Sequence, residues 1–141
     1  MAVIKNKGLT KMMWFYSAAS TLLTTNTFVK LSSGYIVSCV STDTQILGVY
    51  TGPTIAAAVA TATFIPVEVP IEKAVEWLVD VEAGTINVVT SVGLAYDLND
   101  AGGINQGSTT YKPFIVTAVL NTNKGSASLG QVLGVIVPFL S

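Results

Sequence analysis

The chain has 141 residues and few charges, since seven Lys face eight Asp and Glu for a formal net charge of −1. It contains no His and no Arg. These absences exclude His-based catalytic triads and His metal ligands, and they exclude an Arg fork that clamps a phosphate. We also expect no nucleic-acid partner, because nucleic-acid binding needs a dense positive surface.

The surface of this chain must be poor in charge. Charged residues make up 11% of the sequence and apolar residues 50%, whereas a soluble monomer normally carries about 25–35% charged residues on its surface. The best apolar stretch, residues 55–67, is too short for a membrane span and contains Pro66. We therefore expect no membrane partner and predict a homo-oligomer, in the first place a homotrimer.

Residues 1–27 differ from the rest of the chain. They hold three lysines, a short aromatic run and no acid, whereas all eight acids lie between residues 43 and 100. We expect no cleaved signal peptide, since the apolar run is short and aromatic rather than rich in Leu. We interpret the segment as an extended arm that holds the chain to another surface. The candidate contact residues are Lys5, Lys7, Lys11, Trp14, Phe15 and Tyr16.

From Phe28 onward the sequence is typical of short β-strands separated by turns. No long helical pattern and no internal repeat intervenes. The fold class that this predicts is all-β, a small β-barrel or β-sandwich with an extended N-terminal arm, so that residues 1–27 form the arm and residues 28–141 the β domain. The predicted strands cover residues 28–31, 35–40, 46–50, 61–69, 86–89, 92–96, 114–120 and 129–140.

The stretch 70–84 fits two structures. A helix would bring its apolar residues at positions 71, 74, 75 and 78 to one face and end at Gly84. A strand would place Val75, Trp77, Val79 and Val81 on one side and the acids between them on the other. The period of two and the β-branched residues favour a strand at 75–81, and a single helical turn before it stays open.

Residues 97–104, with the sequence DLNDAGGI, resemble the start of a calcium loop. Asp97, Asn99 and Gly102 match the positions of an EF-hand loop, but Ser108 stands where that loop needs Glu. We therefore interpret this segment as a Gly-rich connecting loop and predict no metal site.

Glu68, Glu72, Glu76 and Asp80 recur every four residues. On a strand, neighbours in this row lie about 13 Å apart, farther than the roughly 5–9.5 Å that separates the carboxyl pair of a glycosidase. We interpret the row as a solvated acidic face. With no nucleophile or cofactor motif elsewhere, the sequence predicts no catalytic site and no cofactor, and the lone Cys39, in an apolar run, is predicted to be a buried thiol.

Five stretches of strand-and-turn sequence span residues 31–136. They are LSSGYIV at 31–37, TDTQILGV at 42–49, FIPVEVP at 64–70, VGLAYDL at 92–98 and LGQVLGVI at 129–136. Together they resemble the small head-decoration, or cement, proteins of tailed bacteriophages. The resemblance implies a structural virion protein on the outer capsid surface, bound to the major capsid protein, often as a trimer, with an N-terminal arm laid on the coat lattice.

Two other classes of function were weighed against this resemblance. A carbohydrate-binding β module of a fibre or adhesin would need an exposed aromatic pair on one face, with Trp77 or Tyr111 as the candidates. A hydrolase would need a cleft with convergent polar groups, and the sequence contains no motif for one. We expect the structural role, and the chain is predicted not to be an enzyme.

Overall fold

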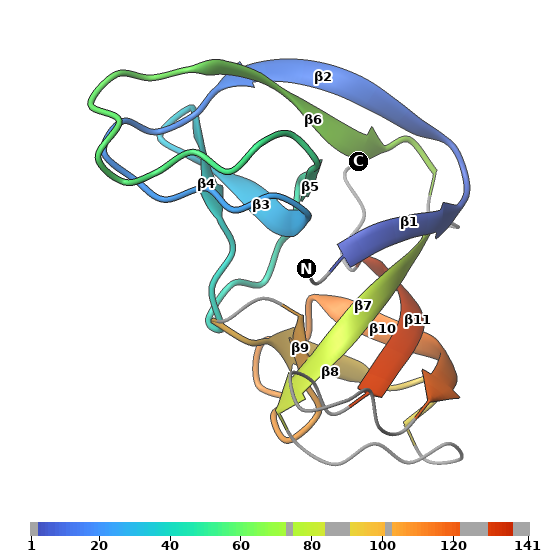
Figure 1. The fold of residues 1–141 in the computed structure, drawn as a ribbon. Helices are drawn as coiled ribbons and strands as arrows, with labels where there is room; N and C mark the ends of the chain where they lie inside the picture. The colour runs from blue at the N-terminus through green and yellow to red at the C-terminus, as the bar shows by residue number, and fades with distance from the viewer. Residues whose placement is uncertain (1–2, 73–74, 84–90, 101–102, 122–129, 137–141) are drawn as a thin grey trace.

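The computed structural model is all-β and describes residues 3–72, 75–83, 91–100, 103–121 and 130–136. These residues form eleven strands and no helix, in two sheets that lie one above the other (Figure 1). The strands are β1 (Val3–Lys7), β2 (Thr10–Tyr16), β3 (Thr27–Ser32), β4 (Tyr35–Ser38), β5 (Gly48–Tyr50), β6 (Phe64–Pro70), β7 (Glu76–Ala83), β8 (Ala95–Leu98), β9 (Ile104–Asn105), β10 (Phe114–Asn121) and β11 (Gly130–Ile136).

The lower sheet in Figure 1 closes on itself. Its strand order is β1-β7-β11-β10-β8-β9, and a parallel pairing between β7 and β9 joins the two sides of the sheet. Five strands therefore form a ring, and β1 lies beside it as an antiparallel partner of β7. Such closure removes strand edges and makes this part of the molecule a small barrel.

The upper sheet has the order β2-β6-β5-β3-β4. A parallel bridge between Ser17 and Ile36 connects the end of β2 to β4, so this sheet is also barrel-like. The turn between β3 and β4 consists of Ser33 and Gly34, both with positive φ angles of 51° and 86°. Two positive φ angles in a two-residue hairpin loop match the twist of the paired strands, which explains the Ser-Ser-Gly sequence at this point.

Alternation along the strands sends apolar side chains into the two barrels. In β6, Ile65, Val67 and Val69 are buried, whereas Phe64 is exposed and Glu68 only partly covered. In β11, alternate residues from Gly130 to Ile136 are buried in the same way. The period of two seen in the sequence therefore corresponds to the inner and outer faces of real strands.

The two sheets share part of one core. Phe28 of β3 lies with its ring centroid 6.4 Å from that of Trp77 in β7 and 5.7 Å from that of Phe114 in β10. Trp77 and Phe114 are fully buried. Burial of each such side chain stabilises the fold by about 1.5–3 kcal/mol, so this aromatic contact holds the upper sheet onto the lower one.

Gly48 allows β5 to approach β6 closely. A Cβ atom at this position would lie 2.2 Å from the carbonyl oxygen of Glu68 on the neighbouring strand. Since that atom belongs to the backbone, any larger residue would push the strands apart. The glycine therefore maintains the short β5–β6 contact, where Val49 pairs with Glu68.

The predicted all-β class, with a barrel-like arrangement of strands, is confirmed, and the strand predicted at 75–81 corresponds to β7. The Gly-rich connecting loop predicted at 97–104 is partly wrong, because Asp97 and Leu98 end strand β8 and Ile104 begins the short strand β9. Pairing with β8, five residues before it, and with the more distant β7 stabilises a strand that is too short to show a period of its own. The strand predicted at 86–89 lies outside the described residues.

The predicted arm contains two strands. Val3–Lys7 pairs with β7 of the lower sheet, and Thr10–Tyr16 pairs with β6 of the upper sheet. The chain crosses between the sheets at Gly8, whose φ of 109° an L-residue rarely adopts. The first part of the segment 1–27 thus contributes to both sheets, and its contact with another molecule stays a prediction.

Candidate functional site

The outer side of the β2–β6 ribbon carries a group of exposed apolar side chains. The two strands pair without interruption from Thr10 with Pro70 to Tyr16 with Phe64. Alternate residues of β2 share one face of a strand. Met12, Trp14, Tyr16 and Phe64 are 49%, 56%, 52% and 54% exposed. We call these four residues the β2–β6 face.

The aromatic rings of this face pack against one another. The Trp14 and Phe64 rings are stacked with centroids 5.3 Å apart, and the Tyr16 and Phe64 centroids lie 4.9 Å apart. Half of three such side chains amounts to about 300 Å² of exposed aromatic surface. The largest apolar patch of a typical monomer is about 300–600 Å² and is often functional, which makes the β2–β6 face the candidate interaction site of this chain.

The structure separates the predicted aromatic contacts. Trp14 and Tyr16 lie on the β2–β6 face, whereas Phe15 is only partly exposed and packs against the core of the upper sheet. Phe64, which sequence reasoning did not select, completes the face as the register partner of Tyr16. The signal that could have found it is its position at the start of the alternating run in β6, in phase with the outward residues.

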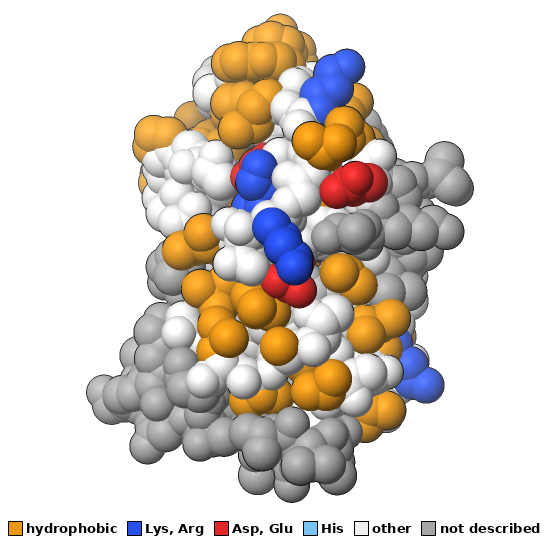
Figure 2. Space-filling view, turned by 90° about the vertical axis from the view of Figure 1, so that its right-hand side faces the viewer, with side chains coloured by type: hydrophobic (Ala, Val, Ile, Leu, Met, Phe, Trp, Pro, Cys, Tyr) orange, Lys and Arg blue, Asp and Glu red, His pale blue; other side chains and the backbone are white. Residues whose placement is uncertain are grey.

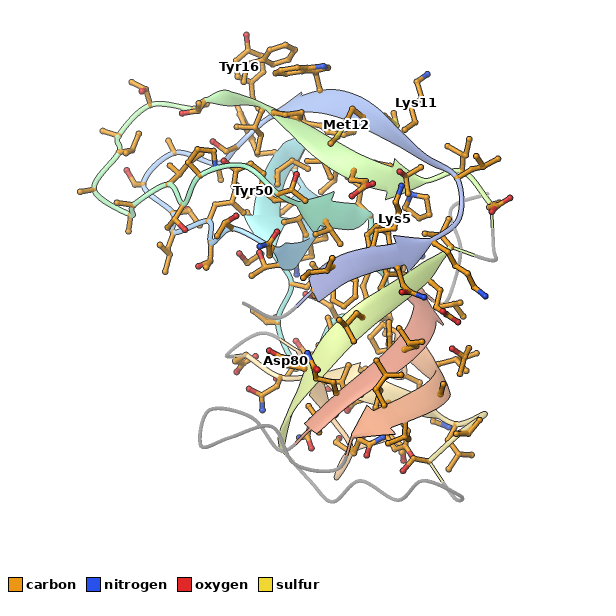
Figure 3. All side chains as sticks on the ribbon, turned by 45° about the vertical axis from the view of Figure 1, so that its right-hand side comes forward. Lys5, Lys11, Met12, Tyr16, Tyr50 and Asp80 are labelled. Carbon is orange, nitrogen blue, oxygen red and sulfur yellow. The ribbon has the colours of Figure 1, made fainter. Side chains whose placement is uncertain are left out.

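The three predicted lysines lie on β1 and β2 and differ in their contacts. Lys5 forms an ion pair with Glu68, with 3.3 Å between Nζ and Oε2, and donates a hydrogen bond to the Thr10 hydroxyl. Lys7 and Lys11 are exposed, and neither side chain forms an ion pair with a residue that the structure describes. Figure 3 shows Lys11 and Tyr16 pointing outward from the same end of the molecule.

The acidic row does not form a catalytic pair. Each of its members is held by a different neighbour: Glu68 accepts from the Thr10 hydroxyl, Glu72 from the Leu9 amide, Glu76 from Asn6 and Thr117, and Asp80 from Gln131. The prediction of a solvated row is wrong for Asp80, which is 5% exposed. Asp80 lies opposite Gln131 in the β7–β11 register, and the amide of that residue replaces water.

Asp97 is a buried carboxylate that closes a loop. It accepts hydrogen bonds from the Ser108 hydroxyl at 2.5 Å and from the backbone amides of Tyr111, Lys112 and Thr110 at 2.6, 2.8 and 3.3 Å. Burial acts to raise the pKa of Asp97, but these four hydrogen bonds outweigh it, so the pKa lies below its usual value. The resemblance to a calcium loop therefore reflects a loop whose carboxylate is occupied by protein donors, and the described residues contain no cluster suited to a metal ion.

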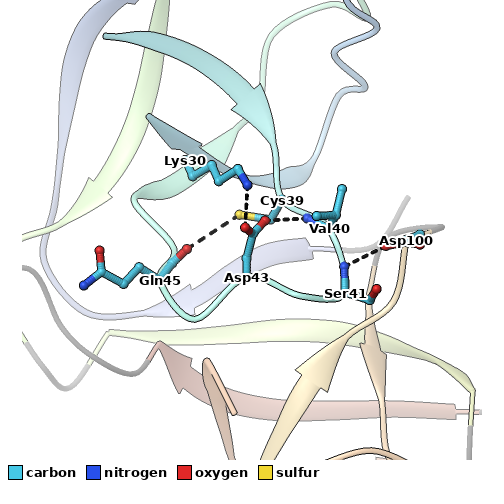
Figure 4. Close-up of polar contacts among 7 residues, drawn as sticks. All are labelled: Lys30, Cys39, Val40, Ser41, Asp43, Gln45 and Asp100. Carbon is cyan, nitrogen blue, oxygen red and sulfur yellow. Dashed lines mark hydrogen bonds and ion pairs between the residues drawn. The ribbon is translucent and has the colours of Figure 1, made fainter. Parts of the chain in front are cut away.

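A pocket of about 300 Å³ lies between β3 and residues 43–47. The two charged residues that line it, Lys30 and Asp43, form an ion pair with each other, and Asp43 also accepts a hydrogen bond from the Val40 amide (Figure 4). Neighbouring Cys39 donates its thiol hydrogen toward the Gln45 carbonyl oxygen. The pocket thus offers no unpaired ion and no nucleophile activated by a base.

Cys39 is expected to react slowly with the thiol reagent 5,5′-dithiobis(2-nitrobenzoic acid) near pH 8, since burial, assisted by the negative charge of Asp43, raises the pKa of the thiol to about 12. Because an unperturbed thiol is about one quarter ionised at that pH, the chain unfolded in guanidinium chloride should react within minutes. A native chain that reacts as fast as the unfolded one would show that Cys39 is accessible and reactive.

The described part of the chain contains no helix long and apolar enough to cross a membrane. No protein-family model, no curated protein and no solved structure matches the chain. The β2–β6 face is therefore the feature on which a function can be argued, because it is the largest apolar cluster of aromatic rings that the described residues leave exposed.

Proposed function

We propose that this chain is a structural virion protein that binds the outer surface of a phage capsid and stabilises the head lattice. The observation that carries the proposal is the β2–β6 face, a preformed aromatic surface in a small β protein. Its partners under this proposal are the major capsid protein and further copies of the chain. The sequence resemblance to head-decoration proteins supports the same assignment.

The geometry suits docking on a protein surface. Interface energy concentrates in a few central aromatic residues, and here three rings are already ordered against one another on a paired strand ribbon. Side chains that are fixed before binding lose less conformational entropy when a partner covers them. An area of about 300 Å² supplies the centre of an interface, and a stable contact of about 800 Å² per partner would extend onto neighbouring residues. Leu9 in the β1–β2 turn and Ile71 after β6, whose amide donates to the Leu9 carbonyl oxygen, are both more than half exposed and are apolar candidates for that extension.

A carbohydrate-binding module is the second candidate, because an exposed aromatic cluster also suits stacking on sugar rings. Trp77, one of the two residues first considered for this role, is fully buried and is excluded, whereas Tyr111 is 40% exposed. The Trp14 and Phe64 rings cover each other, which leaves less ring surface for a sugar. Quenching of Trp14 fluorescence by simple hexoses would favour this candidate over the capsid.

Heads that lack the chain provide the experiment for the proposed function. Addition of the purified chain to such heads is expected to raise the temperature at which they release DNA, because a ligand that binds only the intact lattice stabilises it. The release temperature should increase with concentration of the chain and then saturate. Heads that release DNA at one temperature with and without saturating chain would contradict the proposal.

The chain is expected to assemble as a homotrimer, since 15 charged side chains cannot cover a monomer of this size. Light scattering at high concentration should give a mass of about 44 kDa, three times the 14.7 kDa of one chain. A stable 14.7 kDa species in solution that persists on the heads would show that the chain works as a monomer.

A further inference from the structure

A row of apolar side chains crosses the outer side of the lower sheet. The β1–β7 register places Ile4 opposite Leu78, and the β7–β11 register places Leu78 opposite Leu133. In the β10–β11 register, Ala118 lies opposite Leu133. On β1, β7 and β11 the residues next to members of the row are buried, so alternation along each strand directs the row itself outward. We call Ile4, Leu78, Leu133 and Ala118 the cross-strand row.

The cross-strand row is accessible to solvent in the single chain. Ile4 is 45% exposed, and the other three members are partly exposed. Val135 of β11 and Ile115 of β10 pair with each other nearby and are also partly exposed. Figure 2 shows hydrophobic side chains gathered over the lower half of the molecule, which the lower sheet forms. An apolar surface that spans several strands is a candidate for contact with another molecule.

Strand β11 is apolar on both of its sides. Its residues Val132 and Ile136 are buried in the core, and its outward residues include Leu133 and Val135. In an antiparallel sheet with one solvated side, apolar inward positions alternate with polar outward positions, whereas a strand covered on both sides is apolar throughout. The sequence of β11 therefore indicates that the outer side of the lower sheet is covered in the assembled protein.

The polar side chains that border the row are hydrogen-bonded to one another. On one side, Glu76 accepts from Asn6 Nδ2 at 2.8 Å and from the Thr117 hydroxyl at 3.0 Å. On the other side, Asp80 accepts from Gln131 Nε2 at 3.2 Å. Polar groups that keep partners within the chain lose less when a second molecule displaces their water. These bonds thus lower the cost of covering the row.

We infer that the cross-strand row is the contact between copies of this chain. This inference rests on the homotrimer that belongs to the proposed function, and it names the surface that forms the trimer. Three copies around a three-fold axis turn the same side of each lower sheet inward, so that one row contacts both neighbours. Sheets that pack face to face lie about 10 Å apart, with the side chains of both between them.

Another copy of the chain fits this surface better than a strongly charged partner does. The row itself carries no charge, and its border has both signs, since Lys7 lies opposite Glu76 in the β1–β7 register. A partner selected by its charge therefore gains little here. The chain has only 15 charged side chains in 141 residues, and every copy presents an apolar row of the same dimensions. The row lies on the lower sheet and the β2–β6 face on the upper one, so both contacts can form at once.

Three lysine substitutions test the inference. Leu133→Lys places a charge at the centre of the row, and Ile4→Lys places one at its end, where the side chain is 45% exposed. Leu22→Lys is the matched control, since Leu22 is 52% exposed and lies between β2 and β3, beside the core of the upper sheet. Light scattering gives the mass of each protein over a range of concentrations, and far-UV circular dichroism reports whether it is folded.

We expect wild type and Leu22→Lys to give about 44 kDa, three times the mass of one chain. Leu133→Lys and Ile4→Lys should be folded 14.7 kDa monomers under the same conditions. Burial of an unpaired charge in the contact should raise the concentration needed to form the trimer at least about 100-fold. Should Leu133→Lys fail to fold, Ile4→Lys decides, because its side chain lies outside the core.

The outcomes separate the inference from the proposed function. A folded Ile4→Lys chain that still gives about 44 kDa, or a Leu22→Lys chain that loses the trimer equally, overturns the inference. Wild-type chain that is a monomer at every concentration overturns it too. Sedimentation with heads is a separate measurement: a wild-type trimer that stays in the supernatant overturns the proposed function and keeps the inference. Row variants that remain trimeric but lose head binding would assign the row to the capsid and overturn the inference.

Discussion

Replacing Asp97 with Asn is expected to lower the free energy of unfolding by about 3 kcal/mol. The carboxylate is 2% exposed and accepts four hydrogen bonds. An amide of the same shape keeps one acceptor oxygen, which can still serve the backbone amides of Tyr111 and Lys112. Its N–H₂ group then faces the Ser108 hydroxyl, which must turn to accept, and the Thr110 amide, which is left without a partner. Urea denaturation of the two proteins measures the difference.

Asp100→Asn is the matched control for this change. Asp100 is exposed and accepts from the backbone amide of Ser41, so its replacement should cost less than about 1 kcal/mol. Equal losses for Asp97→Asn and Asp100→Asn would show that the four donors do not depend on the buried charge.

The hydrogen bonds to the Asp97 carboxylate should also make the stability of the chain depend on pH. Because the pKa of Asp97 is lower in the folded chain than in the unfolded chain, its contribution is complete above the unfolded value of about 3.9 and is lost as the pH falls through the lower, folded value. Between neutral pH and acid, wild-type chain should therefore lose more stability than Asp97→Asn. Parallel acid curves for the two proteins would contradict the assigned hydrogen bonds.

Replacing Trp14 with Ala is expected to weaken binding to heads about 30-fold, which corresponds to about 2 kcal/mol. The ring is 56% exposed and stacks on Phe64, so its loss removes the centre of the β2–β6 face and leaves the core of the upper sheet intact. Titration of labelled chain with heads measures the change. The melting temperature reports whether the variant remains folded.

Tyr111→Ala is the control for a lost exposed aromatic side chain. Tyr111 is 40% exposed and lies in the loop before β10, in the lower part of the molecule. Its removal should change head binding less than twofold. Equal weakening by Trp14→Ala and Tyr111→Ala would place the contact elsewhere than the β2–β6 face.

The sequence predicts the fold class well because burial on one side of a strand leaves a period of two. Val75 to Val81 shows this pattern, and there it separates a strand from a helix correctly, although Leu78 and the acids between suit either structure. Phe28, Trp77 and Phe114 are apolar residues of predicted strands and all lie in the core. The local pattern is sufficient for these positions, because the burial of each side chain depends on the face of the sheet that it occupies.

The pairing partners of the strands could not be predicted in the same way. β1 and β2 lie in the segment interpreted as an arm, and their partners β7 and β6 lie about 50 residues away or more. The exposed residues of β1 and β2 give no alternation between apolar and polar positions, because only Val3 of β1 is buried. Strands of this kind are defined by their hydrogen bonds to a strand that is distant in sequence, and the local residue pattern does not contain that information.

The candidate site shows the same division. Trp14 and Tyr16 are conspicuous in the sequence as neighbours in an aromatic run, and the structure places both on the β2–β6 face. Phe64 joins them through the β2–β6 register alone. The sequence also did not predict the structural role of Asp97, because its hydrogen-bond donors at 108–112 are brought to it only by the folded conformation of the loop. The position of Phe64 on the face and the hydrogen bonds of Asp97 both depend on tertiary geometry, which a local sequence pattern does not contain.

Sedimentation of the chain with heads that lack it measures the central claim most directly. Wild-type chain should pellet with the heads and saturate at a fixed ratio to the major capsid protein, and Trp14→Ala should need about 30 times the concentration to reach the same occupancy. Folded wild-type chain that stays in the supernatant at every concentration, or a Trp14→Ala variant that pellets as well as wild type, would contradict capsid docking through the β2–β6 face.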